Sequence, residues 1–261
     1  MLTKRLPAKL FWPKFDKTWP LKRGEEPRKK IAFAATNFSV ERFQKAYQGK
    51  NSFSYFDIPT SCLNQQMNQK RQAEYIAGRL CAHQLLFDFA VNHAHLENDD
   101  KKMPVWPKGI IGSVAHCYPY AVVMIAKSKD YQSIGVSIVS RTESRTEFSL
   151  SSNAAYGVLT QAEILRFATH LDEITLALIC SIKKSFIKAT SPLILSYLYF
   201  DDVNVVAIDW IQGNAELVIE RDLGGQWRKG QSFMAQFDFY HSKVISMLAL
   251  PRQLGFELMF P

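Results

Sequence analysis

The chain has 261 residues, of which 47% are hydrophobic and 21% charged, and its formal net charge is +8. This composition is typical of a compact globular protein with one large or two small domains. No uncharged apolar run reaches about 18 residues, which argues against a membrane-spanning helix. The basic start of the chain lacks the apolar core of a secretory signal. The four cysteines show no zinc-site spacing, so we expect free thiols and a cytoplasmic protein.

The excess of positive charge favours an anionic partner. Much of this charge lies in residues 14–30, and the simplest interpretation of these lysines and arginines is a solvated basic arm. No nucleic-acid recognition motif supports the alternative of a nucleic-acid partner. A basic ligand site and an acidic protein partner account for the sign of the charge, so we expect neither nucleic acid nor a membrane among the partners.

The first half of the chain combines strands and helices. In chain order we expect an extended arm (1–30), a strand (31–36), a short helix (40–48), a long helix (69–90), a loop (97–112) and two strands (120–126 and 132–140). The long helix is predicted by apolar residues that recur at helical spacing. The last two strands look like neighbours joined by a turn.

A polar stretch over residues 143–153 is the expected connection between two halves, 1–145 and 146–261. After it, Thr160 and Glu163 fit a capping box at the start of a helix. The later elements are a helix over 173–189 and strands over 196–200, 204–210, 216–221, 232–239 and 243–249. Strands and helices in both halves, without a strict βαβ alternation, predict an α+β fold.

One predicted strand contains a short segment, residues 135–139 (GVSIV), whose side chains bear on whether a metal ion can bind there. In a strand, side chains at i and i+2 lie on one face about 6–7 Å apart, so Ser137 and Val139 point the same way. Two carboxylates at these positions would suit Mg²⁺, which prefers oxygen ligands. Ser137 is at best a weak neutral ligand, and Val139 is none.

The predicted helix over residues 173–189 carries a stripe that includes Ser181, Lys184 and Lys188 at helical spacing. Two lysines four residues apart repel each other by only about 0.2–0.5 kcal/mol, and a bound anion could reverse that sign. The simplest interpretation of the stripe is a basic face in contact with solvent.

Five segments carry a wider set of motifs. Residues 71–79 (RQAEYIAGR) are similar to R-x-A-E-x-x-A-G-R, and residues 104–117 (PVWPKGIIGSVAHC) to P-x-W-P-x-G-x-x-G-S-x-S-H-C. Residues 159–163 match L-T-x-x-E, and residues 181–188 (SIKKSFIK) fit S-x-K-E-S-x-x-K except at the fourth position. Residues 135–139 stand in place of G-x-D-x-E. Together, and in this order, they resemble the 4′-phosphopantetheinyl transferase family, in its enterobactin and surfactin branch.

The resemblance implies a pseudo-dimer of two similar α/β halves with the active site in the cleft between them, and we expect a monomer. It implies transfer of 4′-phosphopantetheine from coenzyme A to a serine of a carrier protein, as in siderophore, nonribosomal peptide and polyketide synthesis. In this family, Mg²⁺ bridges the pyrophosphate and acidic side chains. The residues implied to contact the phosphates of coenzyme A are Arg71, Arg79, His116, Lys183 and Lys188.

The three acidic positions of the family motifs hold Ser137, Val139 and Lys184 in this chain, so we expect no site for Mg²⁺. Loss of a general base typically slows a reaction about 10²–10⁴-fold. We therefore predict a protein that binds coenzyme A, an acidic acyl or peptidyl carrier protein, or both, with weak or absent transfer. Two alternatives stay open: an active transferase with a rearranged site using Glu163 and Lys184, and a different reaction in the same cleft.

Overall fold

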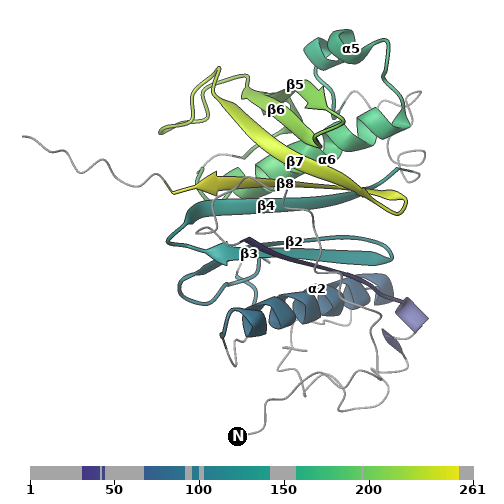
Figure 1. The fold of residues 1–261 in the computed structure, drawn as a ribbon, viewed down its shortest axis with the longest axis vertical. Coiled ribbons are helices and arrows are strands. Elements are labelled where there is room, and N and C mark those ends of the chain that lie inside the picture. Colours follow the sequence, from purple (N-terminus) through teal and green to yellow (C-terminus); the bar gives the residue numbers. More distant parts are fainter. Residues whose placement is uncertain are drawn as a thin grey trace, which may run out of the picture. The chain divides into compact units, whose positions relative to one another are not determined.

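A computed structural model of the chain describes residues 31–41, 43–44, 68–91, 96–99, 103–141, 157–194 and 197–252. The predicted arm and the predicted connection between the halves lie outside these ranges. The chain forms two compact units (Figure 1). Unit 1 consists mainly of residues between Ala32 and Ile125, and unit 2 mainly of residues from Ala126 onward, together with Lys108–Gly112.

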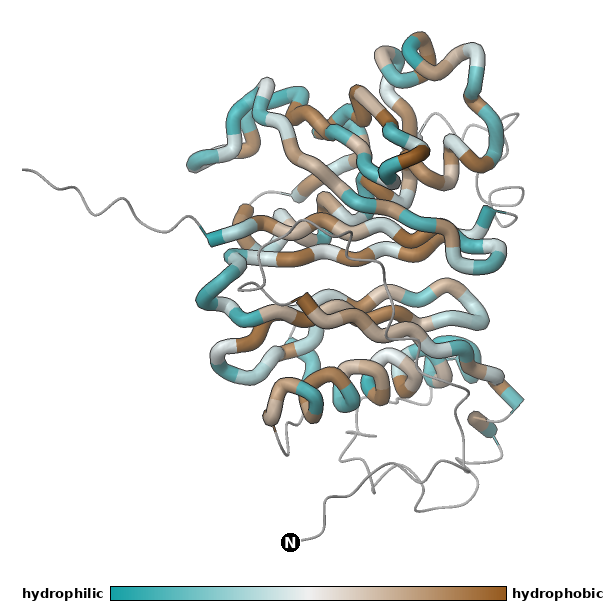
Figure 2. Tube along the Cα trace, in the orientation of Figure 1, coloured by the Kyte–Doolittle hydropathy of each residue, from teal (hydrophilic) through white to brown (hydrophobic). Residues whose placement is uncertain are grey.

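Unit 1 is built from a three-stranded sheet and one long helix. The sheet has the order β1–β3–β2, and its strands are β1 (Ile31–Asn37), β2 (Ile110–Cys117) and β3 (Tyr120–Lys127). Helix α2 (Gln69–Asp88) begins after Asn68, whose side chain accepts a hydrogen bond from the amide of Arg71. Figure 2 shows hydrophobic and hydrophilic residues mixed along the turns of α2, and residues 76–82 in the middle of the helix are all buried. The helix contributes Ala73, Ile76, Ala77 and Leu80 to a buried cluster that also contains Phe38, Phe43 and Ala121.

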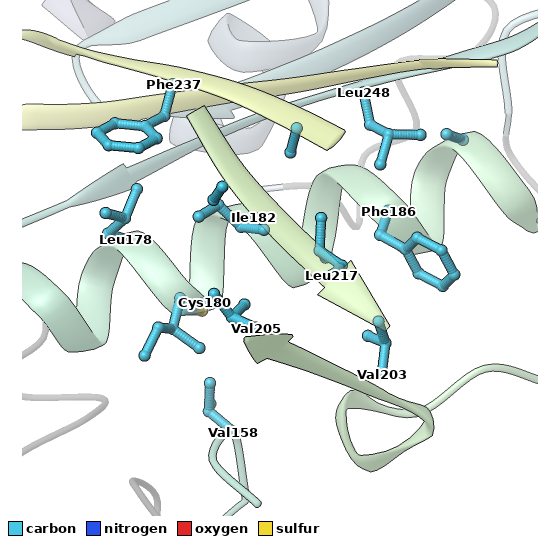
Figure 3. Packing of buried hydrophobic residues seen from close by; sticks show 14 of the residues in the cluster. Val158, Leu178, Cys180, Ile182, Phe186, Val203, Val205, Leu217, Phe237 and Leu248 are labelled. Atoms are coloured by element: carbon cyan, nitrogen blue, oxygen red, sulfur yellow. The ribbon is translucent and has the colours of Figure 1, made fainter. Parts of the chain in front are cut away.

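Unit 2 contains a five-stranded antiparallel sheet with the order β4–β8–β7–β6–β5. Its strands are β4 (Tyr131–Ser140), β5 (Val203–Asp209), β6 (Asn214–Ile219), β7 (Ser232–Tyr240) and β8 (Lys243–Pro251). The long helix α6 (Glu173–Thr190) packs against this sheet, and a short helix α5 (Gln161–Phe167) precedes it. The apolar side chains between α6 and the sheet, seen in Figure 3, include Leu178, Ile182, Phe186, Val205, Leu217, Phe237 and Leu248.

Polar side chains fix where the helices of unit 2 begin. The predicted capping box of α5 is present: the Thr160 hydroxyl accepts from the Glu163 amide, and the Glu163 carboxylate accepts from the Thr160 amide. The Asp172 carboxylate caps α6 by accepting a hydrogen bond from the Thr175 amide at 2.7 Å. Burial raises the pKa of Asp172, but hydrogen bonds from nearby groups outweigh it and hold the pKa below its usual value.

The structure confirms the α+β class, and two details differ from the predictions. Strands β3 and β4 are not neighbours, because β3 lies between β1 and β2 while β4 pairs with β8 in another sheet. The compact units divide near residue 126, and the predicted division into 1–145 and 146–261, which falls outside the described ranges, stays a prediction. In the predicted strand over 196–200, residues 197–199 form no strand, and a 3₁₀ turn, η3 (Phe200–Asp202), follows.

None of the helices within the described ranges has both the length and the apolar character needed to cross a membrane. The cysteines in these ranges, Cys81, Cys117 and Cys180, are not joined in disulfides.

Candidate functional site

The strand segment that carries the altered motif lies on the face of the unit 2 sheet that α6 covers. Residues Gly135, Ser137 and Val139 of β4 lie directly opposite Leu248, Ser246 and Val244 of β8. The β8 residues Val244 and Leu248 belong to the core cluster around α6. Directly opposed residues of an antiparallel pair share one face, so Ser137 and Val139 face α6, and both are buried. The prediction that these two side chains point the same way is confirmed.

Gly135 allows α6 to approach β4 closely. A Cβ atom at this position would lie 2.0 Å from the carbonyl oxygen of Ser185 and 2.6 Å from the amide nitrogen of Ala189. Both are backbone atoms of α6, so neither can move without moving the helix. The motif glycine therefore has a packing role, and it sets the distance between the strand and the helix that carry the altered positions.

A small cluster of serines lies where β4, β8 and α6 meet. The hydroxyls of Ser181 and Ser246 are hydrogen-bonded at 2.8 Å, and both side chains are fully buried. Ser246 is the direct partner of Ser137 across the β4–β8 pair. Neutral hydroxyls thus occupy the interior next to position 137, where the family motif has an acidic residue.

Lys184 and Lys188 follow Ser181 on the same stripe of α6 and are half-buried, while most of their neighbours on the helix are buried. Lys184 precedes Ser185, whose carbonyl lies next to Gly135 of β4. This places the Lys184 backbone close to the motif segment of the strand. The helix therefore brings a cation, and no carboxylate, to the third altered position.

The residues at these positions do not fit a divalent cation. Mg²⁺ demands hard oxygen ligands and is usually held by one or two carboxylates. Position 137 offers one neutral hydroxyl, position 139 a hydrocarbon, and position 184 an ammonium group. Within the described ranges, no group of three or more His, Cys, Asp or Glu side chains is arranged to hold a metal ion.

Lys183, next to Lys184, has a different environment from the one predicted. Its side chain is 0% exposed, and its ammonium donates to the carbonyl oxygens of Val158 and Phe200 at 2.9 and 2.8 Å and to the Glu163 carboxylate at 2.6 Å. An ammonium group has three N–H donors, so these acceptors use all of them. In this structure Lys183 is therefore an internal tie within unit 2, and its contact with a phosphate stays a prediction. Burial lowers the pKa of Lys183, and the adjacent Glu163 carboxylate opposes this shift.

Glu163 is equally enclosed, which argues against its predicted role in a rearranged catalytic site. Its carboxylate is 0% exposed and accepts from Lys183, from the Thr160 amide at 2.8 Å and from the Val205 amide at 2.7 Å. These contacts join α5, α6 and β5. Glu163 thus has a structural role in this conformation, and its part in a rearranged catalytic site stays a prediction.

In unit 1, Arg71 and His116 come together around a carboxylate that the sequence analysis did not single out. The Glu74 carboxylate lies 3.2 Å from the Arg71 guanidinium and 3.4 Å from Nδ1 of His116, and Arg71 also contacts Nε2 of His116. The Arg71 side chain is 51% exposed and that of His116 is 30% exposed, whereas Glu74 is nearly buried. Two potential cations thus share a surface-accessible position on unit 1, with Glu74 holding them in place.

Arg79 has a more internal position than the predicted role suggests. It is 5% exposed, donates to the Asn98 side chain, and lies 4.9 Å from the centre of the Tyr75 ring. A second, longer contact of 3.5 Å joins it to the Glu97 carbonyl. Arg79 therefore ties α2 to the segment after it, and its contact with a phosphate stays a prediction.

Three partners in these sites were not predicted from the sequence. Glu74 follows Arg71 by three residues, and that spacing on a helix was the available indication of their contact. Asn98 and Ser246 had no such indication, because each meets its partner through the tertiary fold. Within unit 2, the structure does bring Ser137, Val139 and the Lys184 backbone into one region.

Comparisons with known proteins agree with these motifs. Residues 60–126 match the family model described as the 4′-phosphopantetheinyl transferase N-terminal domain. Enterobactin synthase component D of Salmonella typhi is 27% identical over 199 residues, which cover 70% of this chain and 82% of the relative. The 4′-phosphopantetheinyl transferase Npt of Nocardia iowensis is 26% identical over 176 residues, covering 65% of this chain and 76% of the relative. The 4′-phosphopantetheinyl transferase PptT of Mycobacterium tuberculosis is 28% identical over 142 residues, covering 52% and 58%. Residues 60–126 thus match the N-terminal domain of the 4′-phosphopantetheinyl transferase family, and the chain as a whole is similar to members of that family.

Proposed function

We propose that this protein binds coenzyme A, an acidic carrier protein, or both, and transfers 4′-phosphopantetheine very slowly or not at all. One observation carries the proposal: the positions that are acidic in the family motifs hold Ser137, Val139 and Lys184, and the two strand residues are buried against α6. Strand β4 and helix α6, which carry the altered positions, are both formed in this chain. The change therefore concerns the chemistry of three side chains.

Transfer requires that a serine hydroxyl of the carrier lose its proton and attack the phosphorus that bears the pantetheine arm of coenzyme A. The new P–O bond forms as the P–O bond of the pyrophosphate breaks, and the adenosine bisphosphate part leaves. A hydroxyl at position 137 and a hydrocarbon at position 139 cannot accept that proton at neutral pH. Position 184 holds a lysine in place of a carboxylate, and an ammonium group is a poor base. General-base assistance typically contributes about 10²–10⁴-fold to a rate, so its loss alone supports very slow transfer.

Binding is supported by the cations that the chain keeps. In unit 1, Arg71 and His116 are accessible and adjacent. In unit 2, Lys184 and Lys188 lie one turn apart on α6. Guanidinium and ammonium groups form charge-assisted hydrogen bonds with phosphates, and the net charge of +8 favours approach of both coenzyme A and an acidic protein.

The carrier protein belongs to the same proposal. Several relatives are enterobactin synthase components, so carrier domains of siderophore synthesis are the first to test, followed by carriers of nonribosomal peptide and polyketide synthesis. The alternative of an active transferase, with a rearranged site using Glu163 and Lys184, has less support, because the Glu163 carboxylate is buried and bound to Lys183. A changed reaction in the same site stays an alternative without a specific observation in its favour.

Two measurements test the proposal. Calorimetry should show coenzyme A binding with a Kd in the micromolar range or tighter, about −8 kcal/mol, or binding of an apo carrier protein. Intact-mass analysis of the apo carrier incubated with coenzyme A and Mg²⁺ should show little or no holo product, with a working family enzyme as the positive control.

A matched pair of arginine variants makes the binding test specific. Arg71→Gln should weaken coenzyme A binding about tenfold, whereas Arg252→Gln, with the same loss of charge at an exposed position, should leave it unchanged. Rapid formation of holo carrier by the wild-type protein would contradict the loss of transfer. Absence of binding to coenzyme A and to every carrier tested would contradict the retained binding.

A further inference from the structure

We infer that Glu74 of α2 is a positioning residue for the ligand. It holds the Arg71 guanidinium by one nitrogen and leaves the opposite edge of that group to bind two oxygens of a single phosphate. The inference deepens the proposed function and rests on it, because coenzyme A supplies the phosphate. Glu74 itself touches no part of coenzyme A and acts through Arg71.

Within the ranges that the structure describes, the contacts of the Arg71 guanidinium all involve one atom, Nη1. This nitrogen donates to the Glu74 carboxylate at 3.2 Å and contacts Nε2 of His116. Nη1 carries two N–H groups, and the whole guanidinium has five. The two contacts therefore occupy Nη1, and the three N–H groups on Nε and Nη2 are not used within these ranges.

The Nε and Nη2 groups of Arg71 form an edge that matches a phosphate. Their N–H bonds are parallel and lie in the plane of the guanidinium, which is the fork that arginine uses for bidentate contacts with phosphates. The Arg71 side chain is 51% exposed, so a phosphate can reach this edge while Glu74 keeps Nη1. The ion pair and the ligand thus use different atoms of one side chain.

Glu74 can fix the guanidinium because its own carboxylate is fixed. The residue is 8% exposed and follows Arg71 by three positions on one face of α2. Its carboxylate also lies 3.4 Å from Nδ1 of His116 on β2, and a buried carboxylate requires such partners. Ordering a long side chain on binding costs affinity, and a guanidinium that Glu74 has already ordered avoids that cost.

The negative charge of Glu74 opposes anion binding, and two variants separate this effect from positioning. Glu74→Gln removes the charge but keeps an oxygen that can accept from Nη1 of Arg71, so its Kd for coenzyme A should stay within about twofold of the wild type. Glu74→Ala removes the oxygen as well and should raise the Kd about fivefold, the order of the cost of ordering one long side chain. Calorimetry measures both. Binding by Glu74→Ala as tight as that of the wild type, or tighter, would overturn the inference.

A double-variant cycle tests whether Glu74 acts through Arg71. In an Arg71→Gln background, Glu74→Ala should change the Kd by less than about twofold, because no guanidinium is left to position. A purely structural role of Glu74 would weaken binding equally in both backgrounds, and that result would overturn the inference. The Tm of each variant shows whether it is folded.

Arg71→Lys tests the fork itself. Lysine keeps the charge but has no planar pair of donors, so the Kd should rise about threefold or more. Equal affinity of Arg71→Lys and the wild type would contradict the bidentate contact and with it the inference. Asp88→Ala, which removes a carboxylate from an exposed position at the far end of α2, is the matched control for Glu74→Ala and should bind as the wild type does.

The two proposals fail in different ways. Coenzyme A binding by the wild type that ignores Glu74, or that depends on it equally without Arg71, overturns the positioning role and leaves the proposed function standing. Absence of coenzyme A binding with retained carrier binding does the same. Absence of both kinds of binding overturns the proposed function together with the inference.

Discussion

At the scale of single residues, two adjacent lysines of α6 have opposite environments. Lys183 is completely buried and bound to a buried carboxylate, while Lys184 is half-buried at the edge of the serine cluster. Burying an ammonium group is unfavourable unless it is paired and fully hydrogen-bonded, and the contacts of Lys183 with Glu163, Val158 and Phe200 meet that condition. Position in the motif alone could not separate the two lysines, because the carbonyl partners come from segments that have no motif.

The first prediction concerns this buried pair. Lys183→Met should lower the free energy of unfolding by about 3–5 kcal/mol, because it leaves the Glu163 carboxylate buried without its cation. The double variant Lys183→Met with Glu163→Gln should recover part of this loss, since the uncompensated charge is gone. Urea unfolding followed by circular dichroism measures both.

Lys184→Met is the matched control and should change the free energy of unfolding by about 0.5 kcal/mol or less. The structural role of Lys183 would be refuted if Lys183→Met were no less stable than this control. A further result would refute the structural role of Lys183. In it, the double variant would have a lower free energy of unfolding than Lys183→Met, by as much as the loss of a second, independent interaction would cause.

At the scale of elements, the contact between β4 and α6 decides the geometry of the altered site. Gly135 brings the two elements together because it has no side chain where the Ser185 carbonyl and the Ala189 amide approach. The neighbouring positions Ser137 and Val139 then face the helix. A motif glycine followed at i+2 and i+4 by the functional positions thus describes a strand that touches a helix.

The second prediction follows from this approach. Gly135→Ala should destabilise the protein by about 3 kcal/mol or more, at the upper end of the range for overpacked cores, because the Cβ would meet backbone atoms of α6. Ser137→Ala, on the same face of the same strand, should cost only about 1 kcal/mol. Thermal or urea unfolding separates the two, and a Gly135→Ala variant as stable as the wild type would show that the helix can shift away.

The elements that the sequence predicted well were those with a local cause. Three helices were indicated by residues close to them in the sequence. The signals were the apolar spacing of α2, the capping box of α5 and Pro192 just after the end of α6. Residues 196–200 were predicted as a strand, and aromatic residues such as Tyr199 are common in strands. In the structure, the Tyr199 amide donates to the Asp202 carboxylate, and the Phe200 carbonyl accepts a hydrogen bond from Lys183. Those tertiary contacts override local preference.

At the scale of the whole molecule, the placing of β4 could not be predicted from the sequence, because β4 pairs with β8 about a hundred residues later in the chain. The polar stretch over residues 143–153 lies outside the described ranges, so the predicted boundary there stays a prediction. The motifs indicated which residues to consider for the site. The burial of Lys183 and Glu163 was not predictable from the motifs, because it is a property of the folded chain.

The third prediction tests whether three side chains limit the activity of the whole protein. The triple variant Ser137→Asp, Val139→Glu and Lys184→Glu should form holo carrier protein in a reaction that needs Mg²⁺, measured by intact mass. Without metal it should be less stable than the wild type, because it buries two carboxylates against α6. Added Mg²⁺ should raise its Tm but not that of the wild type, since a ligand stabilises only the form that binds it.

The Tm measurement also makes a negative result interpretable if the triple variant forms no holo carrier protein. A folded triple variant that gains no Tm in Mg²⁺ and forms no holo carrier would show that the change in this protein extends beyond the three positions. Ser137→Asn, Val139→Gln and Lys184→Gln, combined in one chain, form the matched control. This control has similar shapes without carboxylates and should gain neither activity nor stability from Mg²⁺.

The enclosed pair of Lys183 and Glu163 has a consequence for how such chains are recognised in genomes. Selection for folding alone preserves both residues, because the loss of either one leaves the charge of the other buried without its partner. Their persistence in a descendant therefore records the architecture it inherited and carries no information about turnover. A search that counts this lysine as a mark of catalysis therefore counts a residue that the interior of unit 2 requires.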